Sequence, residues 1–100
     1  ALVALFSTCA IAAMPEYEIV IKDHLFTPNV VTVPADTRVK LRVDNQDSTP
    51  EEFESNDFNR EKIIPGNSKA VIIVPPLEKG EYKFFGEFNE DTAQGILKVE

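Results

Sequence analysis

The sequence has very few of the residues that build reactive sites. Its 100 residues include one cysteine, one histidine and no tryptophan. Cys9 lies in an apolar stretch at the start of the chain, so the rest has no thiolate ligand and no disulfide. His24 has no identifiable nucleophile partner, and the chain has no glycine-rich phosphate loop. We therefore assign no catalytic residue and no organic-cofactor residue, and we expect no turnover by acid–base chemistry.

The first thirteen residues differ in composition from the rest. They read ALVALFSTCAIAA, without charges or turn residues. The run is shorter than the roughly 20 residues of a membrane span, and it carries an A-x-A cleavage pattern at 10–12, or a similar one at 11–13. We interpret 1–13 as a signal peptide remnant and 14–100 as the domain, which predicts a periplasmic protein without a stable membrane span. The alternative for 1–13 is a short apolar helix or strand of the domain.

Acidic residues exceed basic ones by seventeen to ten, giving a formal net charge of −7. All of these charges follow position 13. Nucleic-acid binding depends on neutralising phosphates with basic side chains, so the acidic excess argues against a nucleic-acid partner. It favours metal ions or a basic protein partner.

After position 13, apolar and polar residues alternate in short runs separated by turn residues. In the clearest run, 37–44, Val39, Leu41 and Val43 face one way and the basic residues between them face the other. Such runs, at spacings of roughly 8–12 residues, predict an all-β protein. Their order suits a Greek-key β-sandwich of seven to eight strands. The expected strands are 16–22, 30–33, 37–44, 52–55, 60–64, 68–74, 80–85 and 96–99.

Two local features remain to be placed within this pattern. A turn of helix is compatible with the sequence at 56–59 or 91–94. A small sandwich needs aromatic bulk, so Phe84, Phe85 and Phe88 are expected in the core.

Three segments resemble the cupredoxin-like domains of bacteria. Residues 23–28 (DHLFTP) are similar to their first hairpin, and 45–54 (NQDSTPEEFE) to their N-x-D loop and the following strand. Residues 78–86 (EKGEYKFFG), together with 95–99, resemble their final hairpin with its G-x-Y-x-F strand. The resemblance covers 17–100 and implies a cupredoxin-like Greek-key β-sandwich.

The resemblance fails at the copper ligands. A blue-copper centre uses two imidazoles, a thiolate and usually a weak axial methionine. At the corresponding positions this chain has Glu51 and Asn89 for the histidines, Gly86 for the cysteine, and Ala93 or Gln94 for the methionine. The resemblance therefore implies a cupredoxin fold without a type 1 copper centre.

Segments 51–55, 60–66 and 84–88 are similar to one subgroup of this family. That subgroup accompanies bacterial high-affinity ferrous iron permeases and their periplasmic iron-binding partner. The resemblance implies an accessory protein of iron uptake, with the permease or the iron-binding protein as partner. Asn89 departs from the subgroup, which has a histidine there.

The loop end of such a sandwich would gather carboxylates. Successive strand residues face opposite sides, so Glu52 and Glu54 share a face opposite Phe53. Hard oxygen ligands suit iron, manganese, calcium or magnesium better than Cu(I), whereas Cu(II) accepts mixed carboxylate and imidazole ligands. The sequence leaves the cofactor open, with copper and iron both compatible, and the candidate metal ligands are Glu51, Glu52, Glu54, Glu87, His24 and Asn89.

Some of these residues have simpler explanations. His24 could be a surface loop histidine bonded to the backbone, and the loop carboxylates could be solvated. Glu61, between two basic residues, is expected at an ordinary exposed strand position.

Three functions are compatible with the sequence. The first is a periplasmic accessory protein of iron uptake that binds metal through carboxylates or docks a transport partner. The second is copper-dependent oxidation of ferrous iron or electron transfer, for which one histidine and no cysteine are a poor ligand set. The third is a metal-free interaction module, because a fold alone does not determine function.

Overall fold

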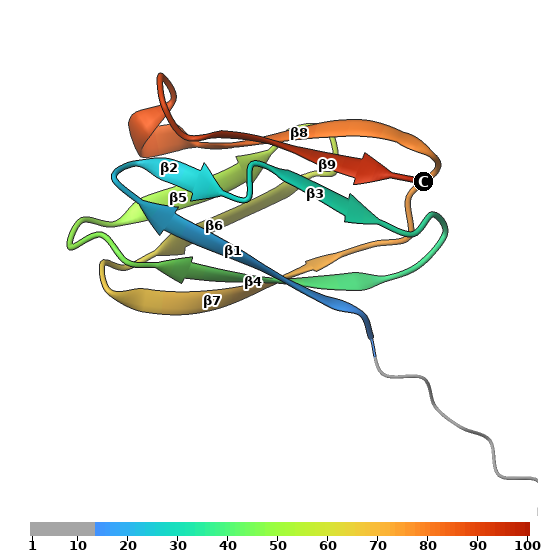
Figure 1. The fold of residues 1–100 in the computed structure, drawn as a ribbon, viewed down its shortest axis with the longest axis horizontal. Coiled ribbons are helices and arrows are strands. Elements are labelled where there is room, and N and C mark those ends of the chain that lie inside the picture. Colours follow the sequence, from blue (N-terminus) through green and yellow to red (C-terminus); the bar gives the residue numbers. More distant parts are fainter. Residues whose placement is uncertain (1–13) are drawn as a thin grey trace, which may run out of the picture.

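The structure is a computed structural model that describes residues 14–100, which form nine strands in two facing sheets (Figure 1). The predicted signal segment 1–13 lies outside the described residues. The first sheet has the order β2-β1-β4-β7. Its strands are β1 (Glu16–Lys22), β2 (Leu25–Thr27), β4 (Val39–Asn45) and β7 (Ser68–Val74).

The second sheet has the order β3-β9-β8-β5-β6. Its strands are β3 (Val30–Val33), β5 (Glu51–Ser55), β6 (Arg60–Ile64), β8 (Gly80–Gly86) and β9 (Gln94–Val99). Strand β1 runs parallel to β4 and β3 runs parallel to β9, whereas the other neighbours are antiparallel. The predicted all-β, cupredoxin-like sandwich is confirmed.

Two predicted details were wrong. The described residues contain nine strands instead of seven or eight, because Leu25–Thr27 forms the short strand β2. Three residues are too few to show the alternation on which strand prediction depends. The helical turn is η1 (Glu87–Asn89), a single 3₁₀ turn, and lies neither at 56–59 nor at 91–94.

The core lies between the sheets and has an aromatic centre. The Phe53 and Phe84 rings stack with centroids 5.1 Å apart, and Phe26 meets the Phe84 ring edge-on at 5.2 Å. Two of the aromatic predictions were wrong. Phe85 follows a buried residue on β8 and so faces outward, and Phe88 on η1 is 49% exposed.

No helix among residues 14–100 is long and apolar enough to cross a membrane.

Candidate metal centre

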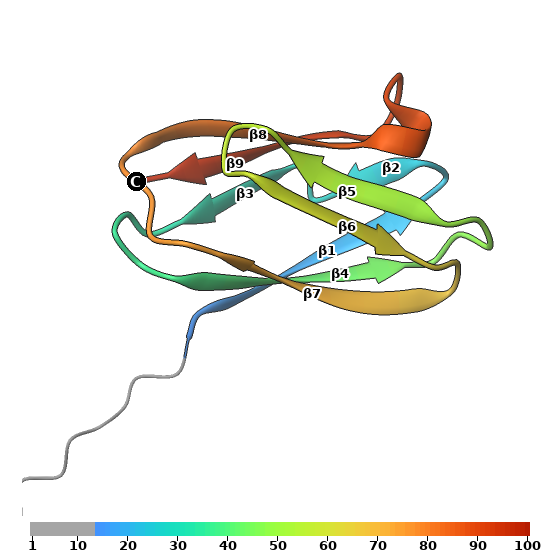
Figure 2. The ribbon, with the colours of Figure 1, turned by 180° about the vertical axis from the view of Figure 1, so that it is seen from behind.

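The β4–β5 loop and η1 lie at the same end of the sandwich, as predicted. Figure 2 shows β5 and β6 in front, with η1 beside the start of β5. Buried Asn45 holds the β4–β5 loop: its Nδ2 lies 2.9 Å from the carbonyl oxygen of Thr49 and 3.2 Å from those of Ile64 and Pro65. These bonds fix where β5 begins, and therefore where Glu51 points.

His24 reaches this end through Asp47, the last residue of the N-x-D motif. The backbone amides of Asp23 and His24 donate to the Asp47 carboxylate at 2.8 and 3.0 Å, and His24 Nδ1 lies 3.5 Å from Asp47 Oδ2. These backbone bonds, that of His24 first, lower the pKa of Asp47. The His24 ring borders an open hollow of about 420 Å³ with η1 and the residues that follow it.

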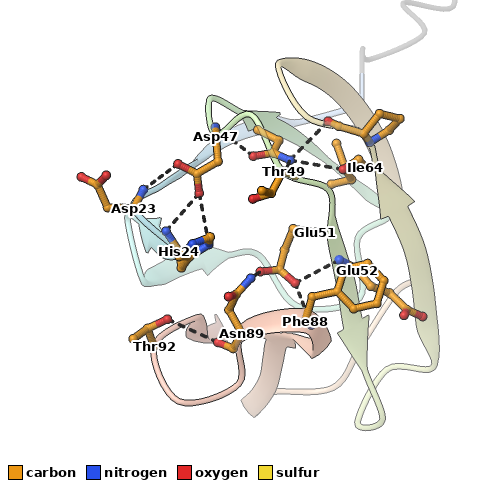
Figure 3. A network of polar contacts seen from close by, with 12 residues as sticks. Asp23, His24, Asp47, Thr49, Glu51, Glu52, Ile64, Phe88, Asn89 and Thr92 are labelled. Carbon is orange, nitrogen blue, oxygen red and sulfur yellow. Dashed lines mark hydrogen bonds and ion pairs between the residues drawn. The ribbon is translucent and has the colours of Figure 1, made fainter.

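Glu51 turns inward and is 1% exposed. Its Oε1 accepts hydrogen bonds from the backbone amides of Glu52 (3.0 Å) and Phe88 (2.9 Å). Its Oε2 accepts a 2.7 Å bond from the Asn89 side chain. Figure 3 shows Glu51 reaching from β5 to η1, while His24 turns toward Asp47. Both oxygens of the Glu51 carboxylate therefore act as acceptors, and three N–H groups donate to them.

Gly86 and Ala93 lie against this carboxylate. A Cβ at Gly86 would lie 2.6 Å from Glu51 Cδ and 2.7 Å from the Ala93 methyl group. The four positions that hold copper ligands in the resembling family are therefore adjacent here. Instead of a thiolate and two imidazoles, they offer one carboxylate already hydrogen-bonded to one amide. These residues do not fit a blue-copper centre.

A second group of carboxylates lies on the opposite face of β5. One oxygen each from Glu52, Glu54 and Glu87 lies within 4.8 Å of the other two. Oxygens bound to a single ion at about 2.1–2.5 Å are separated by at most about 5 Å. These three residues, which we call the carboxylate cluster, are thus close enough to share one ion.

The carboxylate cluster has no basic partner among the described residues. Ion pairs in residues 14–100 involve only Glu16 and Asp47 as acids. The basic residues nearest along β6, Arg60 and Lys62, donate instead to carbonyls of β7. Glu52 is only 6% exposed, and Glu54 Oε2 is buried without a hydrogen-bond partner. A buried carboxylate without a partner is costly, so this cluster calls for a proton or a cation.

The pKa values of two of these carboxyl groups, Glu52 and Glu54, are raised. Hydrogen bonding to Glu61, followed by burial and the nearby Glu87, raises the pKa of Glu52 to about 8. Hydrogen bonding to Glu87, with burial, raises the pKa of Glu54 to about 7. Like charges and burial both disfavour the ionised form, so Glu52 and Glu54 keep their protons to a higher pH than ordinary carboxyl groups, and a metal ion would displace these protons.

The structure therefore divides the six predicted ligands into three groups. Glu52, Glu54 and Glu87 come together, Glu51 pairs with Asn89, and His24 stays with Asp47. That Glu52 and Glu54 share a face is confirmed, since an oxygen of each lies within 4.8 Å of the other.

Glu61 adjoins the carboxylate cluster, although its flanking basic residues pointed to an ordinary exposed position. It lies directly across the β5–β6 ladder from Glu54, which places both side chains on the same face. The register of this hairpin was the signal that could have revealed it.

Comparison with known proteins identifies the fold. A family model for the cupredoxin-like domain matches residues 1–99. An uncharacterized protein from Rickettsia prowazekii (strain Madrid E) is 50% identical over 84 residues, covering 84% of this chain and 67% of that protein.

Solved structures with copper are similar in fold. Auracyanin A, a blue copper protein from Chloroflexus aurantiacus, has a TM-score of 0.76 at 15% identity, covering 88% of this chain and 100% of auracyanin A. The metal-binding domain of a Cu(I)-exporting P-type ATPase from Streptococcus pneumoniae D39, solved with Cu(I), has a TM-score of 0.72 at 14% identity, covering 85% of this chain and 84% of that domain. At such identities the likeness is one of fold.

Proposed function

This chain belongs to the cupredoxin-like domain family, and from that premise we propose that it binds a hard divalent metal ion at the carboxylate cluster rather than copper at the family's position. The observation that carries the proposal is the convergence of three carboxylates without a basic partner, one with a buried, unpaired oxygen. An all-oxygen site favours hard ions such as Fe²⁺ or Mn²⁺ over Cu(I).

The biological setting follows as part of the same proposal. The protein would act in the periplasm as an accessory component of high-affinity iron uptake, with Fe²⁺ as its cargo. Hard ligands at the site, the acidic charge and the subgroup resemblance of three segments support this role. An iron permease or a periplasmic iron-binding protein would be the partner that delivers or receives the ion.

The surface proposed to dock the transport partner lies at the same end of the molecule. Phe88 is 49% exposed and borders the hollow that also includes His24, Glu90 and Asp91. An exposed aromatic ring with an acidic rim suits a partner that presents a basic surface. For copper-dependent oxidation we find no such support, because Glu51 and Asn89 are already bonded to each other.

The metal proposal is tested by titrating the chain with Mn²⁺, and with Fe²⁺ under anaerobic conditions, using isothermal titration calorimetry. We expect saturable binding by the native chain that is lost in the double variant E52Q/E54Q. The control is E78Q/E81Q, which removes the same number of carboxyl groups near the opposite end of β8 and should bind normally. Equal binding by both double variants, or no binding by the native chain, would overturn the proposal.

Binding should also release protons, because Glu52 and Glu54 keep their protons to a higher pH than ordinary carboxyl groups. Calorimetry in two buffers of different ionisation enthalpy measures this release directly. We expect apparent affinity for Mn²⁺ to rise between pH 6 and 8, the range set by the raised pKa values of Glu52 and Glu54.

A further inference from the structure

We infer that Glu51 and Asn89, at two of the family's copper-ligand positions, are positioning residues that hold Glu87 in place within the carboxylate cluster. The inference rests on the proposed function, because it concerns the same ion site. At the position where the family binds copper, Glu51 on the inward face of β5 holds η1 through Asn89. The first residue of η1, Glu87, completes the carboxylate cluster on the outward face.

Because side chains alternate along β5, the residue that holds η1 and the residues that would bind the ion lie on opposite faces of the strand. Glu51 points inward to η1, while Glu52 and Glu54 point outward into the carboxylate cluster. Glu87, the third member of the cluster, is the first residue of η1. The two residues that follow it, Phe88 and Asn89, are those that Glu51 binds.

The ladder between β5 and β8 ends beside η1, where Gly86, the residue before the turn, pairs with Phe53. None of the three residues of η1 is buried, and its N-cap residue, Gly86, has no side chain that could cap the turn. Within the loop, the Gly86 amide donates to the Ala93 carbonyl at 2.9 Å, and the Ala93 amide donates to the Asn89 carbonyl at 2.8 Å. These bonds close the loop on itself. On the inward side, the Glu51 side chain of β5 reaches η1 through two hydrogen bonds, one from the Phe88 amide and one from the Asn89 side chain. On the outward side, Glu54 of β5 interacts with Glu87 of η1.

Gly86 makes the link possible. The Glu51 carboxylate lies where a side chain at that position would begin, since a Cβ there would be 2.8 Å from Glu51 Oε2. Glycine at the family's cysteine position and the hydrogen bond between Glu51 and Asn89 therefore depend on each other, because a side chain at position 86 would displace the Glu51 carboxylate. When a residue that orients a metal ligand, without binding the metal itself, is removed, the metal affinity of the site typically falls about 10- to 100-fold.

The test exchanges the hydrogen-bonding partners. Asn89→Leu removes the donor to Glu51 and keeps the branched shape of the side chain. The double variant E51Q/N89D reverses the pair: the Gln oxygen still accepts from the Phe88 and Glu52 amides, and its NH₂ group donates to the new carboxylate. Mn²⁺ affinity is measured by calorimetry, the Phe88 amide is followed by NMR, and the unfolding midpoint is recorded for each variant.

We expect Asn89→Leu to weaken Mn²⁺ binding roughly 10- to 100-fold and to shift the Phe88 amide resonance, with E51Q/N89D restoring both. A merely structural role would lower the unfolding midpoint of Asn89→Leu but leave the affinity of the folded protein unchanged, and this result would overturn the inference.

Glu87→Gln separates this inference from the proposed function. If Glu87→Gln weakens binding and Asn89→Leu does not, only the positioning role fails. If the native chain does not bind Mn²⁺, the proposed function fails, while the Phe88 resonance still reports whether Glu51 and Asn89 hold η1.

Discussion

Gly86→Ala tests how tightly the Glu51 carboxylate fills the former copper position. Gly86 has φ −96° and ψ 110°, an extended conformation that alanine adopts without strain. Any cost must therefore come from the added methyl group. That methyl would lie 2.6 Å from Glu51 Cδ and 2.7 Å from the Ala93 methyl, and both neighbours are fully buried.

The magnitude follows from these contacts. Overpacking a closed site costs about 1–3 kcal/mol. If the carboxylate withdraws, at least one hydrogen bond to a charged group is lost, worth about 1.5–3 kcal/mol. We expect Gly86→Ala to lower the free energy of unfolding by about 2–5 kcal/mol, allowing for the fact that such effects do not add fully.

Urea unfolding measured in a double-mutant cycle with Glu51→Ala is the assay. Truncating Glu51 removes one of the two close contacts and leaves that with the Ala93 methyl, so Gly86→Ala should cost clearly less in that background than in the native one. An equal cost in both backgrounds would refute the reasoning, because the methyl would then act on something other than Glu51. So would a cost below about 0.5 kcal/mol in the native background, the range of an ordinary surface change.

Three further predictions address charge and copper. The folded protein binds protons on Glu52 and Glu54 more tightly than the unfolded chain, in which the carboxyl pKa is near 4.5. The free energy of unfolding, measured with urea, should therefore fall as pH rises from about 4.5 to 8. The variant E52Q/E54Q should show a smaller decline. The lowered pKa of Asp47 acts in the opposite direction: its contribution is present above pH 3.8 and lost in stronger acid, so Asp47→Asn should reduce stability at pH 7 and weaken the acid dependence. Gly86→Cys, with Cys9 changed to serine, should give no intense thiolate-to-copper absorption with Cu²⁺, because the Glu51 carboxylate occupies the space that the thiol needs; a strong visible band would show that the position still accepts copper.

The fold was largely predictable because it depends on alternation. In β4, Val39, Leu41 and Val43 are fully buried, as their spacing indicated. Strand β2 escaped prediction because three residues cannot display a period of two. Exposure of Phe88 escaped it because that residue lies on a 3₁₀ turn, where strand alternation does not apply.

The candidate site was predictable only in part. Sequence placed the acidic residues at one end of the sandwich, and alternation put Glu52 and Glu54 on one face. It did not separate Glu51 from them, although Glu51 shares the inward face with Phe53. The Glu51–Asn89 bond depends on how η1 folds back over β5, and the involvement of Glu61 depends on the β5–β6 register. Both are tertiary relations that a pattern along the chain does not encode.

The central claim is that the ion site has moved from the inward to the outward face of β5. Anomalous scattering from crystals of the chain soaked in Mn²⁺ tests it most directly. The account predicts one strong peak bounded by the carboxylates of Glu52, Glu54 and Glu87, with the Glu51–Asn89 hydrogen bond intact. A peak between Glu51 and Asn89, a peak at His24, or no ordered ion at any concentration that stabilises the protein would contradict it.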